Sequence, residues 1–119
     1  MTTQEIASKL VEICRKGDFE KAQTELFSND AMSIEPHATP AFAKETKGLQ
    51  AIKEKAQKWN SMVEEMHDLT VSDALVGTNS FACTMRMNVT MKGEGKMDMT
   101  ELCIYRVKDG KIISEEFFM

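Results

Sequence analysis

The sequence predicts one α+β domain in which a curved antiparallel sheet wraps onto three N-terminal helices to form a cone. Apolar residues recur at helical spacing in the first half of the chain, whereas they alternate with period two from His67 onward. Helices that precede a long antiparallel sheet are typical of the α+β class, and a bent sheet on helices encloses a pocket. The length of 119 residues suits one unit, so we expect residues 1–119 to form a single domain.

Two short helices are predicted at the N-terminus. Thr2 and Glu5 form a capping-box pattern, and apolar residues then follow at helical spacing until Gly17, which can end the helix. Asp18 can cap a second helix at once, and this helix is expected to end before Asn29 and Asp30.

A short strand, a loop and a third helix are predicted next. Pro36 disfavours helical backbone at the residue before it, which predicts a strand over residues 31–35. Residues 36–47 contain two prolines and little periodicity, so we expect a loop that can serve as a lid over a pocket. The third helix carries one apolar stripe that needs a surface to cover. The stripe consists of Leu49, Ile52, Ala56, Trp59 and Val63.

Four strands are predicted after His67, separated by turn signals at residues 77–79, 93–95 and 109–110. The strand after the first turn alternates most clearly, and its predicted core face comprises Phe81, Cys83, Met85, Met87, Val89 and Met91. The same phase in the following strand groups Met97, Met99, Glu101, Cys103, Tyr105 and Val107 on the core face. Leu102 and Ile104 then point outward, which favours a homodimer that forms through the outer face of the sheet.

Composition excludes several classes of partner. The chain carries 15 Lys and Arg residues against 19 Asp and Glu residues, a formal net charge of −4, which disfavours nucleic acid. The N-terminus lacks the pattern of a secretion signal, and no segment approaches the roughly 20 apolar residues of a membrane span. Three cysteines without a C-x-x-C pair suit reduced, buried thiols better than disulfides, although a reactive thiol remains an alternative. We therefore expect a cytoplasmic protein without a membrane partner.

Two glutamates are the main candidates for catalysis. Glu35 closes a strand beside a proline and a loop, where a carboxylate can reach into a cavity and act as a general base, or can be a solvated strand end. Glu101 lies in phase with apolar neighbours, and a buried carboxyl group there needs a partner or a proton. Tyr105, two residues further on, is the expected hydrogen-bond donor to Glu101 if that glutamate is structural.

His67 is the third candidate catalytic residue, because it shares its phase with Leu69 and Val71 and is expected at the start of a strand on the core side. A histidine there can be an acid or base, or a core or rim residue. A metal site formed by Glu35, His37, His67 and Glu101 is an alternative, but their spacing matches no metal motif. No fingerprint of a cofactor, phosphate loop or nucleophilic hydrolase occurs, so we expect neither a metal nor a cofactor.

The last strand carries Glu115 and Glu116 in sequence, and the turn before them decides which one faces inward. A two-residue turn at residues 109–110 would send Glu116 inward. A three-residue loop over residues 108–110, with a bulge at its glycine, would send Glu115 and Phe117 inward. The second alternative buries a large aromatic ring and is therefore preferred. Candidate ligand contacts are Trp59, Met85, Met87, Tyr105, Glu115 and Phe117, because aromatic and thioether side chains suit flat apolar ligands.

The chain resembles the SnoaL-like branch of the nuclear transport factor two superfamily over nearly its whole length. The resemblance rests on Gly17-Asp18, Asp30-Ala31, Ile34-Glu35-Pro36, Gly48 with Ala51-Ile52, Asp109-Gly110-Lys111-Ile112, Glu115 and Phe117-Phe118. It implies a cystatin-like α+β cone with a deep pocket, often dimeric through the sheet. The superfamily contains ketosteroid isomerase, polyketide cyclases, dehydratases and binders without activity, so the fold does not determine the function.

The same resemblance assigns roles to single positions. Glu35 matches the general-base aspartate that precedes a proline in ketosteroid isomerase, and Glu115 is the glutamate that faces the pocket. Leu10 and Cys103 stand where that isomerase has the two donors of its oxyanion hole, so steroid isomerisation of that type would need Glu101 or Tyr105 as a substitute.

Two functions are compatible with these residues. In the first, the pocket catalyses a cofactor-independent isomerase, cyclase or dehydratase reaction on a small, largely apolar molecule, with Glu35 as the base and Glu101, His67 or Tyr105 as the acid. In the second, the pocket only binds such a molecule, or the chain is a dimeric interaction module, and the carboxylates have structural roles.

Overall fold

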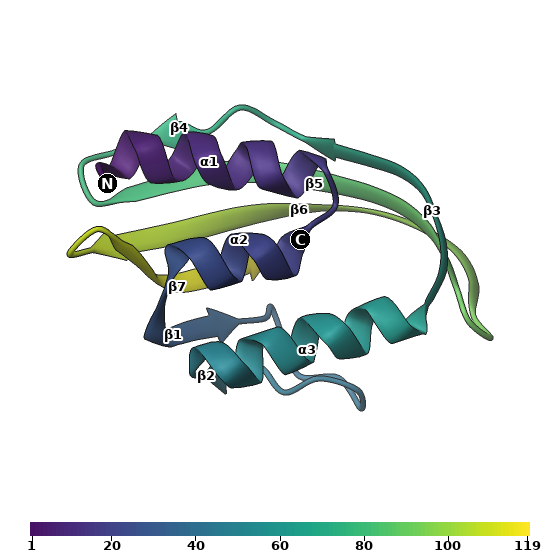
Figure 1. Ribbon diagram of the computed structural model, residues 1–119. Helices are drawn as coiled ribbons and strands as arrows, with labels where there is room; N and C mark the ends of the chain where they lie inside the picture. The colour runs from purple at the N-terminus through teal and green to yellow at the C-terminus, as the bar shows by residue number, and fades with distance from the viewer.

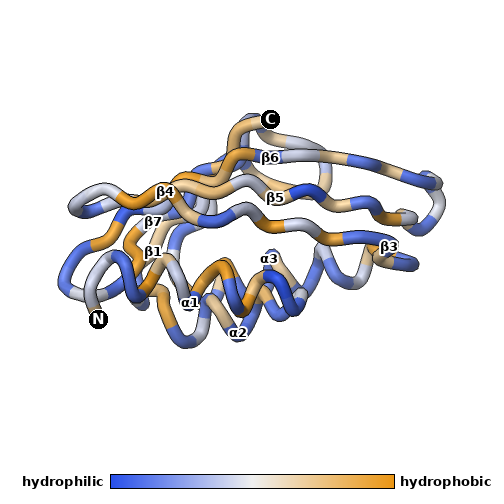
Figure 2. Tube along the Cα trace, turned by 90° about the horizontal axis from the view of Figure 1, so that it is seen from above, coloured by the Kyte–Doolittle hydropathy of each residue, from blue (hydrophilic) through white to orange (hydrophobic).

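Three helices lie on one face of a curved sheet in the computed structural model, which describes residues 1–119 (Figure 1). Seen from above, helices and strands form two layers (Figure 2). The helices are α1 (Thr3–Arg15), α2 (Phe19–Leu26) and α3 (Leu49–Met62). The strands are β1 (Phe27–Ile34), β2 (Glu45–Lys47), β3 (Val63–Val71), β4 (Leu75–Val76), β5 (Ser80–Met91), β6 (Gly95–Lys108) and β7 (Lys111–Phe118). The predicted α+β cone is confirmed.

Side-chain caps define the first two helices as predicted. The backbone N–H of Glu5 donates to Thr2 Oγ1 at 3.1 Å, and the N–H of Thr2 donates to the Glu5 carboxylate at 2.9 Å. Asp18 caps α2 by accepting from the N–H of Lys21. Gly17 between the two helices has a φ of +77°, a conformation that favours glycine. These contacts satisfy donors that a helix start leaves free.

The first strand begins earlier than the sequence indicates. Phe27 ends α2 and at once adopts an extended backbone that pairs with Ile112 of β7, so β1 begins at Phe27 and not at residue 31. The predicted loop over residues 36–47 is also too long, because β2 pairs antiparallel with the end of β1. Tertiary pairing overrides the weak local signal in both places.

Helix α3 ends one residue before its predicted limit, since Val63 starts β3 and pairs with Met91. Ile52 is fully buried, whereas Ala56 and Trp59 keep partial exposure and line the cavity described below. The predicted apolar stripe therefore covers the core at one end and a cavity at the other.

The sheet has the strand order β2-β1-β7-β6-β5-β3, and β4 pairs with β5. Strands β1 and β7 run parallel, so the sheet is mixed and the prediction of a purely antiparallel sheet is wrong in this respect. Most of the chain lies between these two strands, and no hairpin turn forces them to be antiparallel.

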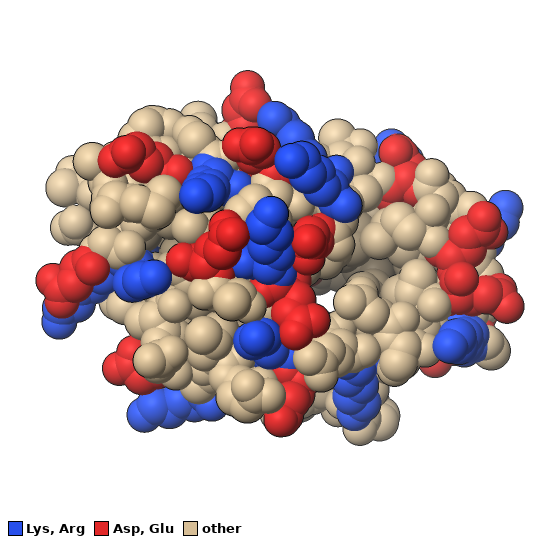
Figure 3. All heavy atoms as spheres, viewed as in Figure 1, with Lys and Arg blue, Asp and Glu red and all other residues tan.

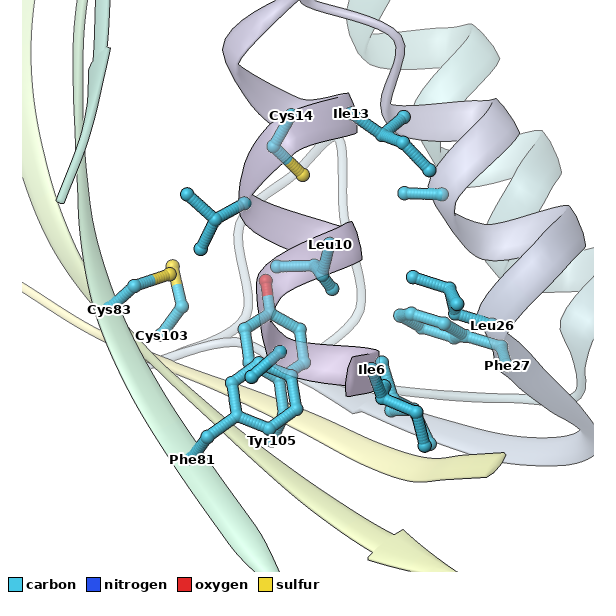
Figure 4. Close-up of a cluster of buried hydrophobic side chains, with 14 of the residues drawn as sticks. Ile6, Leu10, Ile13, Cys14, Leu26, Phe27, Phe81, Cys83, Cys103 and Tyr105 are labelled. Carbon is cyan, nitrogen blue, oxygen red and sulfur yellow. The ribbon is translucent and has the colours of Figure 1, made fainter. Parts of the chain in front are cut away.

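The predicted alternation is confirmed along β5 and in the second half of β6, whereas Met97 is 37% exposed and Met99 and Glu101 keep partial exposure. All six residues predicted on the core face of β5 are buried, as are Cys103, Tyr105 and Val107 of β6. Figure 4 shows this core between α1 and the sheet, where the ring of Tyr105 stacks on Phe81 with centroids 4.8 Å apart. Cys14, Cys83 and Cys103 are free and buried, as expected.

The turn before β7 differs from the preferred prediction, although the predicted orientation of Glu115 is confirmed. Lys108 pairs with Lys111, so the loop has two residues, Asp109 and Gly110, with φ angles of 52° and 74°. The register then shifts, because Val107 pairs with Ile112 but Arg106 pairs with Ser114. This bulge adds one residue to β7 and turns Glu115 inward.

A second bulge overturns the predicted place of His67. The pairing of β3 with β5 shifts between Met66 and Asp68, so His67 is the extra residue and leaves the phase of Leu69. Its Nε2 lies 2.6 Å from the hydroxyl of Thr90, on the outer face of β5. His67 is exposed and does not line the cavity.

No helix of the structure has the length and apolar character needed to cross a membrane. On the face that carries the helices, acidic and basic side chains are interspersed (Figure 3).

Candidate functional site

A cavity of about 330 Å³ lies between the helices and the sheet. Fifteen of its 24 lining residues are hydrophobic, so the cavity suits a largely apolar molecule. Of the predicted site residues, the lining contains Glu35, Trp59, Met85, Met87, Glu101, Tyr105, Glu115 and Phe117. His67 is the one predicted site residue that lies elsewhere.

Neighbouring strands place Glu115 at the base of a polar cluster. In the register of the sheet, Glu115 stands opposite Ser33 of β1 and opposite Tyr105 of β6. The hydroxyl of Ser33 donates to Glu115 Oε2 at 2.6 Å, and Lys55 Nζ of α3 donates to the same hydroxyl at 2.5 Å. Lys55 Nζ also lies 3.2 Å from the carboxylate of Glu35. Lys55 therefore contacts Glu35 directly and is connected to Glu115 through the hydroxyl of Ser33.

Burial changes the pKa of Glu115, the carboxyl group at the base of this cluster. Desolvation raises the pKa of Glu115, a shift that the hydrogen bond from Ser33 and the charge of Lys55 oppose. Glu115 is only 5% exposed and accepts no direct contact from a cation. A proton on this carboxyl group is therefore favoured more than it would be in water.

Glu101 is the carboxyl group best suited to proton transfer. Desolvation in the apolar wall, together with the charges of Glu35 and Glu115, raises the pKa of Glu101 to about 7, and the charge of Lys55 opposes this shift. No hydrogen bond to another residue holds its carboxyl group, so the expected donation from Tyr105 is not formed. At neutral pH this group can both hold and release a proton.

The hydroxyl of Tyr105 points toward Leu10 of α1 (Figure 4). Burial raises the pKa of Tyr105 well above its ordinary value, so the phenol stays protonated. It can donate a hydrogen bond but cannot act as a base near neutral pH.

Sequence reasoning missed Ser33, Lys55 and Gln23. Lys55 occupies a position within the apolar stripe of α3, three residues after Ile52 and four before Trp59, and a cation there is a signal of an internal partner. Ser33 shares its strand phase with Glu35. Gln23 lines the cavity from α2, and its amide oxygen is buried without a partner.

The alternative of a metal site receives no support from the geometry. His37 lines the cavity with Glu35 and Glu101, but His67 lies on the outer face of the sheet. No three His, Cys, Asp or Glu side chains lie close enough together to hold a metal ion.

The cavity thus combines an apolar lining with a carboxyl group that titrates near pH 7 and a carboxylate paired with a lysine. Such a set can remove a proton from a carbon acid and protonate an oxygen, or can orient a ligand through hydrogen bonds.

The sequence matches the model of the SnoaL-like domain over residues 1–119. A candidate SnoaL-like polyketide cyclase from Mesorhizobium loti has a similar structure, with 32% identity, complete coverage of both chains and a TM-score of 0.92. No protein of curated function matches the chain.

Two further structures are similar in fold. A protein with a cystatin-like fold from Xanthomonas campestris superposes with a TM-score of 0.81 at 18% identity, covering 99% of this chain and 90% of the other. A protein with a ketosteroid isomerase-like fold from Catenulispora acidiphila, in complex with trimethylamine, has a TM-score of 0.72 at 19% identity, with coverages of 99% and 87%. These identities support the fold alone.

Proposed function

The chain belongs to the SnoaL-like domain family, and from that premise we propose that its cavity binds a small, largely apolar carbonyl compound and catalyses a cofactor-independent acid-base reaction on it. The reaction is of the isomerase, cyclase or dehydratase type. One observation carries the proposal: Glu101 lies in an apolar cavity wall that brings its pKa to about 7, beside the carboxylate of Glu35.

The roles follow from the contacts of the two groups. Glu35 removes a proton from the carbon next to the carbonyl group, and the ammonium group of Lys55 stabilises this carboxylate at 3.2 Å. Protonated Glu101 donates its proton to the carbonyl oxygen as negative charge develops there, which produces an enol. In an isomerisation, protonated Glu35 then delivers its proton to another carbon of the ligand while Glu101 takes back the enol proton. In a dehydration, Glu101 takes back the enol proton and the leaving hydroxide departs as water with the proton from Glu35. In a cyclisation, the enol carbon attacks a second carbonyl group, whose oxygen takes the proton from Glu35 while Glu101 takes back the enol proton.

The second candidate function is binding without catalysis. It is favoured by the pairing of Glu35 with Lys55 and of Glu115 with Ser33, because paired carboxylates already have a structural role. Binding without catalysis is also favoured by Leu10 and Cys103, because the resemblance to ketosteroid isomerase places them where that enzyme has its oxyanion donors.

Hydrogen exchange on a carbonyl probe separates the two functions. In D₂O near pH 7, the protein should accelerate exchange of the hydrogens next to the carbonyl group of 1-tetralone, measured by NMR. Glu35→Gln and Glu101→Gln should each reduce this rate at least about 100-fold, whereas the exposed Glu25→Gln should not. Quenching of the Trp59 fluorescence by the probe without accelerated exchange would support binding alone and would exclude the catalytic proposal.

We also propose that the outer face of the sheet forms a homodimer. Leu102 and Phe118 are register partners on this face and are 40% and 42% exposed, and Ile104 lies beside them. A lysine at position 102 would bury an unpaired charge in the interface. We expect a dimer in sedimentation analysis that Leu102→Lys converts to a monomer, whereas Gln50→Lys, at an exposed residue of helix α3 in the other layer of the molecule, leaves it intact. A monomeric wild type at micromolar concentration would contradict this proposal.

A further inference from the structure

The side chain of Gln23 is a polar group without a partner in the wall of the cavity. Gln23 lies on α2, which packs between α1 and α3 (Figure 1). The residue is only 8% exposed, yet its amide oxygen is buried without a hydrogen bond, and its amide nitrogen donates to no group of the chain. Buried amides are normally paired, because removing them from water without compensation destabilises the fold.

The side chain of Gln23 forms no hydrogen bond inside the protein, and its nearest neighbours in sequence that line the cavity are apolar. Its neighbours in the cavity wall on α2 and at the start of β1 are Phe19, Ala22 and Phe27, all of them apolar. An apolar residue at this position would continue that wall without an unpaired amide. Gln23 also stands on the helical wall, whereas Glu101 and Glu115 belong to the sheet. The cavity therefore has an unpaired amide on the α2 side and carboxyl groups on the sheet.

We propose that Gln23 determines the specificity of the cavity by binding a hydroxyl group of the ligand. This inference rests on the proposed function and deepens it, because it requires an apolar ring compound with two oxygen groups. The carbonyl oxygen faces Glu101, and the hydroxyl group on the far side of the ring system meets the Gln23 amide. A hydroxyl group suits an amide because it donates to the oxygen and accepts from the nitrogen. In the structure the amide oxygen is shielded from the open cavity, so the amide has to turn about its last torsion, which is broad in glutamine, to meet a bound ligand with both of its polar atoms.

Matched probes test this inference with the single tryptophan, Trp59, as the reporter in the cavity wall. The probes are 6-hydroxy-1-tetralone, which carries both oxygen groups, and 1-tetralone, which lacks the hydroxyl group. Wild type should bind the hydroxylated probe about five- to tenfold more tightly, as expected for one additional hydrogen bond. Gln23→Met, which keeps the length of the side chain, should bind both probes with the affinity that wild type shows for 1-tetralone.

Two further variants serve as controls. Gln23→Leu repeats the measurement with a different apolar shape, so that a packing defect in one variant does not decide the result. Gln50→Leu replaces an exposed glutamine at the start of α3 and should keep the wild-type preference for the hydroxylated probe. Both Gln23 variants should also unfold at the same or a higher temperature than wild type, because they remove an unpaired buried amide.

Several results would overturn the inference. These are equal binding of both probes by wild type, a preference that persists in both Gln23 variants, and an equal loss of affinity for both probes. An internal water molecule that already satisfies the amide would give the first of these results. In all three cases, binding of 1-tetralone with accelerated hydrogen exchange would leave the proposed function intact. If neither probe quenches Trp59, the proposed function fails together with the inference.

Discussion

The ammonium group of Lys55 lies 3.2 Å from the carboxylate of Glu35, and both side chains are largely shielded from water, with exposures of 15% and 26%. The same ammonium group donates to the hydroxyl of Ser33 and lies 5.5 Å from the centre of the Phe117 ring. Helix α3 thus contributes the one lysine that lines the cavity, beside three glutamates. The charge of this lysine lowers the pKa values of both Glu101 and Glu115.

Replacement of Lys55 by methionine should raise the pKa values of Glu101 and Glu115, because the charge of Lys55 lowers both. Loss of the ion pair and of the bond to Ser33 should also reduce the free energy of unfolding by about 1–3 kcal/mol at pH 7. Carboxyl NMR titration and urea unfolding measure the two effects. Lys53→Met, on the same helix with a contact of 4.0 Å to Glu20, is the matched control and should change neither pKa. Unchanged titration of Glu101 in Lys55→Met would contradict this electrostatic role.

Replacement of Ser33 by alanine should raise the pKa of Glu115 further, since the hydroxyl of Ser33 stabilises the ionised form. The variant should lose about 1–3 kcal/mol of unfolding free energy, and this loss should be larger at pH 8 than at pH 5 because ionised Glu115 needs the donor more. Ser28→Ala removes an exposed hydroxyl bond to Asp30 on the same strand and should have little effect. A loss in Ser33→Ala that is independent of pH would point to packing instead.

Replacement of Glu101 by glutamine should remove a pH dependence of stability. The pKa of Glu101 rises from 4.5 to about 7 on folding, so the folded state binds more protons between these values and wild-type stability falls as the pH rises through this range. The full difference is on the order of 3 kcal/mol. Wild type and Glu101→Gln should therefore unfold alike at pH 4, and the variant should be more stable at pH 8. Parallel stability curves from pH 4 to pH 8 would show that Glu101 has no raised pKa.

Replacement of Gly110 by alanine should reduce the unfolding free energy by about 1–2 kcal/mol, because Gly110 has a φ of +74° that alanine adopts with strain. An added methyl group would meet Met1 only at ordinary contact distances of 3.5 Å or more, so the backbone accounts for the loss. Asp109→Gly, at the other residue of the turn with a φ of 52°, should not destabilise the protein. Equal stability of Gly110→Ala and wild type in urea would mean that the turn tolerates another conformation.

Several features of the fold and the site were predictable because they depend on local chemistry. Capping side chains act within a few residues of a helix start, so the caps formed by Thr2 and Asp18 could be predicted from the sequence. The alternation of side chains along a strand is a property of its backbone, so the inward position of Glu101 could be predicted as well. The position of Glu115 was also predicted, but through a three-residue turn that does not form. A bulge in β7 performs the same shift of one residue.

The sequence by itself thus determined the α+β cone, the core faces of β5 and of the second half of β6, and the carboxyl group of Glu101 in an apolar wall. Only the tertiary structure decided that His67 leaves the core side, that β1 runs parallel beside β7, and that Lys55 and Ser33 join Glu35 to Glu115. The physical reason is the same in each case. A single extra residue in one strand reverses the face of its neighbours, and partners that lie far apart in the chain meet only when strands and helices pack.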